Sequence, residues 1–155
     1  MSRAFVKDDD GGQGNEDLPD RLISEHPNLV TPEGLAQIEA EVKRLGEAYA
    51  AAQVAADRAE LTRVARDLRY WSARQSSAQV VTPPPGHQEV HFGSTVTIRR
   101  EDGRKHTYRI VGEDEADPSK GSLSYVSPLA QMLAGKSVGD TVKVGGGEAE
   151  ILGIG

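Results

Sequence analysis

Few residues of this chain combine a chemically useful type with a spacing that supports catalysis or metal binding. The chain has no Cys, which excludes a disulfide framework, a thiolate zinc site and a Cys nucleophile, and fits a reducing compartment. The run Gly145-Gly146-Gly147 precedes another strand-like segment and lacks a Lys-Ser/Thr, so it predicts a hairpin turn and not a phosphate loop. Of His26, His87, His91 and His106, only His87 and His91 are four residues apart. They lie outside the expected helices and no Cys is available, so no metal site is indicated.

The remaining candidates are charged. Asp57 and Glu60 stand three residues apart in Asp57-Arg58-Ala59-Glu60, a spacing that is also common on charged helices, where an acid can cap a helix start. Four arginines follow within twelve residues, at Arg63, Arg66, Arg69 and Arg74. What either group can do depends on the elements that position it.

Length and composition limit those elements. A chain of 155 residues suits one medium domain or two small ones. Hydrophobic residues make up 37%, but there are only two Phe, one Trp and four Tyr, so we expect an aliphatic core. No stretch approaches the roughly 20 apolar residues of a membrane span, and the N-terminus lacks a secretory pattern, so we expect a cytoplasmic protein. The net charge of −6 argues against independent binding to duplex DNA.

The N-terminal region is acidic. Residues 1–20 hold six acids against Arg3 and Lys7, together with the run GGQG and almost no apolar residues. Such a segment cannot bury enough surface to offset its ordering entropy. We therefore expect a disordered acidic tail over residues 1–27, which either solubilises the chain or docks on a basic partner surface.

Residues 28–81 predict an antiparallel helical hairpin of the coiled-coil type. Thr31-Pro32-Glu33 is a helix start, with Thr as N-cap and Pro at the first helical position. Apolar residues then recur in steps of three and four, first over Leu35–Ala56 and then, out of phase, over Leu61–Ala78. The break places Asp57–Glu60 at the far end of the hairpin. An alternative hypothesis places the turn at Gly46, which would make the second arm much longer than the first.

The second half predicts a small antiparallel sheet domain with one short helix, so the fold class is α+β. Residues 82–88 form a Pro-rich linker, and residues 89–155 form the domain. Ser127-Pro128 opens the helix, which Gly135 closes. Turn signals separate six expected strands, over Glu89–Phe92, Thr95–Arg99, His106–Val111, Ser122–Val126, Thr141–Val144 and Glu148–Ile154.

Over residues 28–155 the chain resembles the GreA/GreB family of bacterial transcription elongation factors. Several blocks occur in the family's order, which is more specific than any lone motif. They are Val30-Thr31-Pro32-Glu33-Gly34, Phe92-Gly93-Ser94-Thr95-Val96, Tyr108 to Asp117, Ser127-Pro128-Leu129-Ala130, Leu133 to Lys136, and Val138-Gly139-Asp140. The resemblance implies a coiled coil joined to an FKBP-like C-terminal domain.

The resemblance also implies a function. Family members bind RNA polymerase at the rim of its secondary channel and insert the coil toward the active centre. There they stimulate the polymerase's own cleavage of backtracked RNA, so the chain would be an accessory factor and not an enzyme. Two acids at the coil tip, here Asp57 and Glu60, would help to hold a catalytic Mg²⁺ shared with the polymerase, since Mg²⁺ accepts one or two carboxylates and keeps its waters. No cofactor is expected on the chain alone.

Two departures leave a second function open. The family's tip usually has Gly before the Asp and Asn after the Glu, whereas this chain has Ala56 and Leu61. About eight to ten residues are also missing from each arm, or roughly 12–15 Å of reach at 1.5 Å per residue. A shorter coil would occupy the channel without delivering its carboxylates, and would modulate or inhibit transcription.

Two further sites follow from the resemblance. Arg63, Arg66 and Arg69 would line the channel against the nascent RNA 3′ end, unless they are a solvated face paired with Asp67, Glu39 and Glu41. Val126, Ser127 and Pro128 would bind polymerase, although the family often has an acid where this chain has Val126, and Ser127 can simply cap the helix.

An FKBP-like sheet also raises peptidyl-prolyl isomerase activity as an alternative. That reaction needs an apolar cleft lined by aromatic side chains. The C-terminal half offers only Phe92, Tyr108 and Tyr125 for it.

Overall fold

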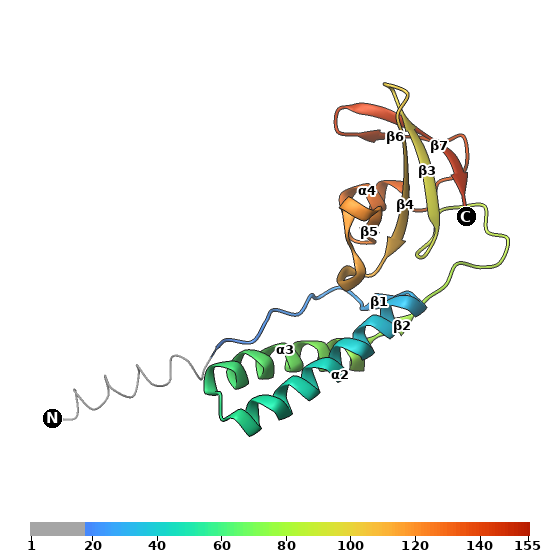
Figure 1. The fold of residues 1–155 in the computed structure, drawn as a ribbon. Helices are drawn as coiled ribbons and strands as arrows, with labels where there is room; N and C mark the ends of the chain where they lie inside the picture. The colour runs from blue at the N-terminus through green and yellow to red at the C-terminus, as the bar shows by residue number, and fades with distance from the viewer. Residues whose placement is uncertain (1–17) are drawn as a thin grey trace. The chain divides into compact units, whose positions relative to one another are not determined.

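The computed structural model describes residues 18–155, which form two compact units (Figure 1). One unit comprises residues 18–25 and 36–77, and the other comprises His26–Leu35 and Ala78–Gly155. Of the predicted disordered tail, residues 1–17 lie outside the described residues. In the described residues, no helix is both long enough and apolar enough to cross a membrane.

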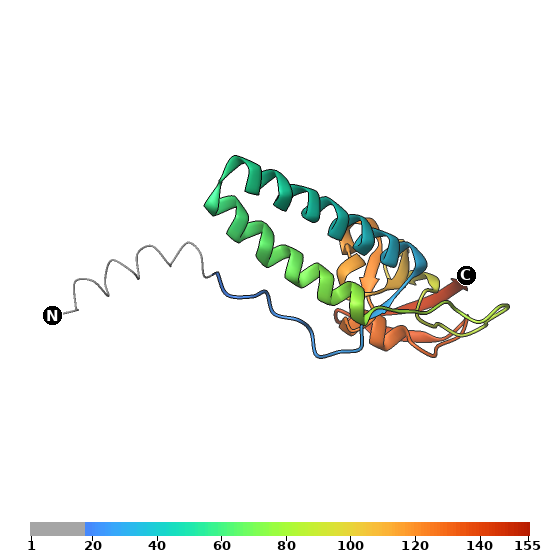
Figure 2. The ribbon, with the colours of Figure 1, turned by 90° about the horizontal axis from the view of Figure 1, so that it is seen from below.

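Two long helices dominate the first unit. Helix α2 spans Pro32–Ala55 and helix α3 spans Arg58–Ser77, and they lie side by side in both views (Figures 1 and 2). The hairpin prediction is therefore confirmed. Gly46 lies inside α2, so the alternative turn at that residue is wrong.

The seam between the helices follows the predicted apolar pattern, with two differences. Its buried residues on α2 recur every seven residues, as in a coiled coil, and α3 has one buried apolar residue. These residues are Ile38, Leu45, Ala52 and Val64. Ala56, the last position of the first predicted stripe, is exposed in the turn. On α3 the buried residue near the end is Arg74, at 2% exposure, whereas Gln75 of the predicted stripe is exposed.

A short strand pair, not predicted from the sequence, brings the two ends of the hairpin together. Strand β1 (Leu29–Val30) pairs in parallel with β2 (Gln79–Val80), so Leu29 lies opposite Gln79. Both strands belong to the second unit. The chain thus enters α2 and leaves α3 at one place.

The second unit contains a five-stranded sheet in the order β5-β4-β3-β7-β6. Its strands are β3 (Thr95–Arg100), β4 (Lys105–Val111), β5 (Ser122–Ser124), β6 (Thr141–Val144) and β7 (Gly147–Ile154). Every pair is antiparallel, as predicted, except β4–β5, which is parallel because residues 112–121 carry the chain back through the short helices η1 (Glu113–Glu115) and η2 (Pro118–Lys120). Residues 89–92 form no extended strand, only an isolated bridge from Glu89 to Ser137.

The turn between β6 and β7 matches the hairpin prediction. Gly145 and Gly146 connect the two strands with φ of +55° and +91°. A two-residue hairpin of type I′ needs positive φ at both positions, which glycine adopts without a steric penalty. The glycine run is thus a turn within the sheet and not a phosphate loop.

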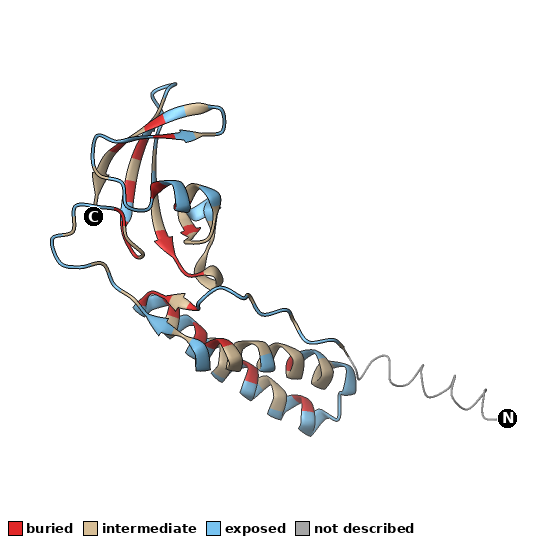
Figure 3. Cartoon of the chain, turned by 180° about the vertical axis from the view of Figure 1, so that it is seen from behind, coloured by how far each residue is buried: buried red, intermediate tan, exposed pale blue. Residues whose placement is uncertain are grey.

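The core of the second unit is aliphatic, as the composition predicted. Helix α4 (Pro128–Leu133) contributes Ala130 and Leu133 to it. Buried positions, red in Figure 3, recur along the strands. The sheet residues of this core are Val96, Ile98, Ile110, Leu123, Val142, Ala149 and Ile151.

Candidate functional site

The turn between α2 and α3 contains only Ala56 and Asp57. Ala56 has a φ of +55°, in the left-handed region, and is the one non-Gly residue of the described chain with a positive φ. Its N–H donates to Gln53 O at 3.1 Å, and the N–H of Asp57 donates to Ala52 O at 3.1 Å. This pair of bonds is a Schellman motif, whose left-handed position usually holds Gly. The structure therefore explains why a Gly before the Asp is the usual choice at such a turn.

Asp57 also begins the second helix. Its Oδ1 accepts a hydrogen bond from the backbone N–H of Glu60 at 3.1 Å, and its carbonyl accepts the N–H of Leu61 at 2.9 Å. Asp57 is thus the N-cap of α3, a position where carboxylates are strongly preferred. The same residue ends one arm and starts the other, and its side chain is exposed.

Glu60 lies in the first turn of α3, where a negative charge is favourable. Its carboxylate forms an ion pair with the guanidinium of Arg63, one turn further along the helix. The structure therefore brings Asp57 and Glu60 together at the tip, each with a partner within the chain. Arg63 is thus paired with one of the two tip acids.

The tip alone offers few metal ligands. Within the described residues, no group of three or more His, Cys, Asp and Glu side chains is placed to hold a metal ion. The contacts described above engage Oδ1 of Asp57 and Oε1 of Glu60. Two adjacent carboxylates fit the one or two protein ligands that Mg²⁺ commonly takes, provided that further ligands come from elsewhere.

Arg66 and Arg69 of α3 differ in their hydrogen-bond partners. Arg69 Nε donates to Asp20 Oδ1 at 2.7 Å, and the Nε of Arg66 is buried without a hydrogen-bond acceptor. Of the acids suggested as neighbours of these arginines, Asp67 pairs with Arg21 and Glu41 pairs with Arg44. The N-terminal segment, which no sequence pattern placed here, thus supplies the partner of Arg69.

The predicted docking residues lie at the start of α4, in the second unit. Ser127 Oγ accepts the N–H of Ala130 at 3.3 Å, so Ser127 is the N-cap of this helix. Val126 donates its N–H to Ser124 Oγ at 3.2 Å. Pro128 is exposed, and the other two residues are half-buried. The segment is held in place by these bonds and is accessible.

Comparison with known proteins identifies the family. A family model described as "Transcription elongation factor, GreA/GreB, C-term" matches residues 85–154. The Transcription elongation factor GreA of Alkalilimnicola ehrlichii is 38% identical over 140 residues, which cover 87% of this chain and 85% of that protein. The chain belongs to the GreA/GreB family.

Other relatives have the same printed name. The Transcription elongation factor GreA of Helicobacter pylori strain Shi470 is 36% identical over 140 residues, covering 84% of this chain and 79% of that protein. Among solved structures, GreA factor homolog 1 (Gfh1) of Thermus thermophilus aligns with 84% of this chain and 99% of that chain, at 21% identity and a TM-score of 0.41.

Several GreA/GreB motif residues prove to form one hydrogen-bonded junction in the second unit. The carboxylate of Glu115 accepts the N–H of Thr31 at 2.9 Å and the N–H of Gly112 at 3.1 Å, and it also accepts the hydroxyl of Thr31. Thr31 Oγ1 in turn accepts the N–H of Gly34 at 2.9 Å. A Cβ at Gly34 would overlap the Glu115 carboxylate, and one at Gly112 would overlap the carbonyl of Leu29. The junction thus explains why these two motif positions hold Gly.

Charged and aromatic side chains extend this junction. Arg109 Nη2 donates to Glu33 Oε1 at 3.1 Å, and the Tyr125 hydroxyl donates to Pro27 O at 2.5 Å. A hydrogen bond from its own backbone N–H, together with Arg109, lowers the pKa of Glu33 below its ordinary value. The sequence predicted Thr31 as a helix cap, but not its bond to Glu115 or the pairing of Glu33 with Arg109. The presence of Thr31 and Glu115 in two separate motifs was the available signal.

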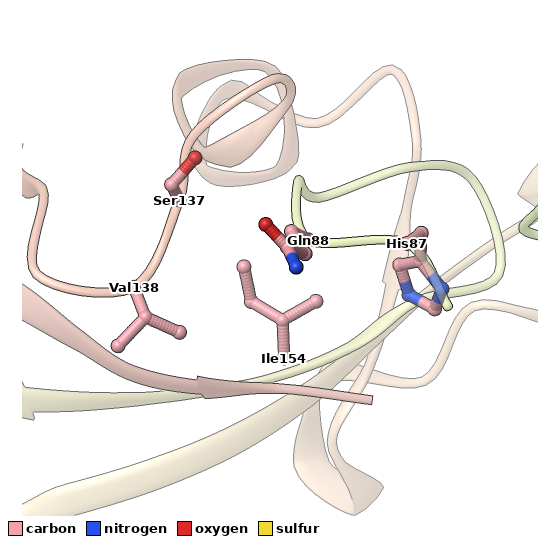
Figure 4. A pocket seen from close by; sticks show the side chains of 5 residues that line it. All are labelled: His87, Gln88, Ser137, Val138 and Ile154. Atoms are coloured by element: carbon pink, nitrogen blue, oxygen red, sulfur yellow. The ribbon is translucent and has the colours of Figure 1, made fainter.

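A pocket beside the end of β7, shown in Figure 4, is relevant to the isomerase alternative. The pocket is lined by His87, Gln88, Ser137, Val138 and Ile154. None of the three aromatic candidates lines it, and Phe92 instead packs edge-to-face against Tyr125, with ring centroids 5.6 Å apart. This pocket is therefore not the aromatic cleft that proline isomerisation would need.

Proposed function

We propose that this chain binds RNA polymerase, inserts its helical hairpin into the secondary channel and stimulates the polymerase's own cleavage of backtracked RNA. The observation that carries the proposal is that Asp57, in the two-residue turn, and Glu60, in the first turn of α3, lie together at the tip of the hairpin. The tip lies between the end of α2 and the start of α3, at the opposite end of the hairpin from Pro32 and Ser77. The chain acts as an accessory factor, because the catalytic site is the polymerase's.

The chemistry of the tip is electrostatic. Asp57 and Glu60 would hold a Mg²⁺ ion together with the polymerase, and the bound ion would supply the charge that activates water and stabilises the leaving oxygen. Asp57 contributes a carboxylate whose direction is fixed by its cap bond to Glu60. To hold the ion, Glu60 would have to release Arg63, and this ion pair is weak because both side chains are partly exposed.

Docking occurs through the start of α4. Val126, Ser127 and Pro128 contact the polymerase, and the N-cap bond of Ser127 keeps the segment in one conformation. Substituting Pro128→Glu adds a charge to this contact and weakens polymerase binding, whereas Gln131→Glu adds the same charge to an exposed position of the same helix. Equal binding by both variants would exclude this segment from the contact.

A second function is supported by the same turn. Both tip acids already have partners within the chain, and α2, with 24 residues, is only about 36 Å long. A hairpin of this length whose acids stay engaged occupies the channel without delivering them. The chain would then inhibit transcription or increase pausing.

Backtracked elongation complexes distinguish the two functions. The wild-type chain, Asp57→Asn/Glu60→Gln and the control Glu47→Gln, an exposed acid of α2, are each added and the RNA 3′ end is followed. Cleavage stimulation predicts RNA shortening that the double variant loses by on the order of tenfold or more, with polymerase binding unchanged. Pausing without shortening, equal in all three proteins, supports the second function.

A further inference from the structure

The segment Leu18–Glu25 has no helix or strand and lies against α3 within the first unit (Figures 1 and 2). An acidic and a basic residue of this segment each pair with an oppositely charged residue of α3. Asp20 Oδ1 accepts from Arg69 Nε at 2.7 Å, and Arg21 Nη1 lies 3.3 Å from Asp67 Oδ1. We call this segment the N-terminal strap.

Arg21 of the strap also contacts the aromatic residues of α3. Its guanidinium carbon lies 3.9 Å from the ring centroid of Tyr70 and 5.8 Å from that of Trp71. These two rings pack edge-to-face, with centroids 5.1 Å apart. A guanidinium at this distance from an aromatic ring is a cation–π contact. Two ion pairs and the cation–π contact of Arg21 thus attach the strap to α3.

The attachment is electrostatic and not apolar. Leu22 of the strap is 94% exposed and Ile23 is 49% exposed, so these two apolar side chains do not anchor it, and of its apolar residues only Leu18 is half-buried. Side chains in both ion pairs keep between 30% and 70% of their exposure. Such pairs are weak and are screened by salt. Another anion can therefore replace Asp20 at Arg69.

The strap occupies one of the donors that RNA would use, the Nε of Arg69. Phosphate oxygens and carboxylates bind the same guanidinium N–H groups, so Arg69 cannot hold Asp20 and a phosphate through Nε at once. Arg63 is likewise held by Glu60, and the Nε of Arg66 is buried. Asp20 therefore controls whether Arg69 is available on this flank.

We propose that the N-terminal strap is an intramolecular competitor of single-stranded RNA, which must leave Arg69 before the arginine flank of α3 holds RNA. The inference rests on the RNA-facing role of this flank in the proposed function. The sequence before the strap adds five acids and two basic residues over residues 1–17, which increases the negative charge that competes with RNA. The strap thereby restricts RNA binding by the free factor.

Two variants with unchanged net charge test the competition. Asp20→Ala/Arg21→Ala releases the strap, and Glu41→Ala/Arg44→Ala removes an unrelated pair on α2. Binding of a fluorescent single-stranded RNA 12-mer to the full chain is measured by anisotropy at low salt, without polymerase. The strap variant should bind several-fold more tightly than wild type, the control should not, and adding Arg69→Ala should abolish the gain. Equal affinity of the wild type and the strap variant would overturn the proposal.

The single Trp of the chain provides a measurement that needs neither RNA nor polymerase. Raising the salt concentration should release Arg21 and change the emission of Trp71 in the wild type, but not in Arg21→Ala. A salt-independent spectrum in both proteins would show that Arg21 does not leave the aromatic pair, and the strap would not be a competitor. RNA anisotropy and Trp71 emission are both measured without polymerase. A failure to stimulate RNA cleavage would therefore refute the proposed function without deciding whether the strap competes with RNA.

Discussion

Asp57 accepts a hydrogen bond from the backbone N–H of Glu60, at 3.1 Å, so the first acid of the tip fixes the backbone that carries the second. The two residues therefore have a structural role that precedes any chemistry. This role makes simple alanine substitution ambiguous, because Ala removes both the cap and the charge.

Asn at residue 57 separates these effects. Asn caps a helix as well as Asp does, whereas Ala does not, so Asp57→Ala should lower the free energy of unfolding by about 1 kcal/mol and Asp57→Asn by much less. Urea unfolding followed by circular dichroism measures both. If the two variants lose equal stability, the cap does not stabilise α3. Otherwise Asp57→Asn is the variant to use in functional assays.

Ala56 and Gly46 should respond to opposite substitutions. Ala56 has a φ of +55°, so Ala56→Gly should raise the unfolding free energy by roughly 0.5–1 kcal/mol after the entropy of Gly is counted. Gly46 lies in α2, and a Cβ there would meet nothing within 4 Å, so Gly46→Ala should add about 1 kcal/mol. A loss of stability in Ala56→Gly would contradict the left-handed turn.

Glu115 should matter more for stability than an ordinary exposed acid. Glu115→Ala leaves the N–H groups of Thr31 and Gly112 without their acceptor, which should cost roughly 3 kcal/mol. Glu148 is exposed, and Glu148→Ala should change stability by less than about 0.5 kcal/mol. Thermal unfolding of both variants is the measurement. Similar losses would mean that the junction does not hold the start of α2.

Glu33 should make the stability of the fold decrease as the pH falls into the acidic range. Its pKa is lowered from the ordinary value of 4.5, so the ionised form is stabilised by folding. The resulting contribution is present above this value and disappears as the pH falls through the lowered pKa. The melting temperatures of wild type and Glu33→Gln should therefore differ at neutral pH and converge below pH 4.5. A difference that persists unchanged in acid would contradict the pairing with Arg109.

The hairpin, the sheet and α4 were predictable because each has a local signal. Periodic apolar residues defined both arms, and Ser127-Pro128 defined α4. The turn was predictable because the two apolar stripes are out of phase, although neither Gly nor Pro marks it. The left-handed position of this turn is Ala56, and an Ala gives no sequence signal for a positive φ.

Long-range polar contacts were not predictable. The Thr31–Glu115 bond joins residues 84 positions apart, and the Asp20–Arg69 bond joins residues 49 positions apart. No periodicity encodes either partner. The burial of Arg74 was missed for the same reason, since an apolar pattern cannot distinguish a paired charge in a seam from an exposed one.

The magnesium dependence of RNA cleavage tests the role of the tip most directly. Backtracked complexes are titrated with Mg²⁺ in the presence of wild type or Asp57→Asn/Glu60→Gln, and the concentration giving half-maximal cleavage is compared. If the tip acids help to hold the ion, the wild type lowers this concentration several-fold and the double variant does not. The same half-maximal concentration with both proteins would contradict metal delivery by Asp57 and Glu60.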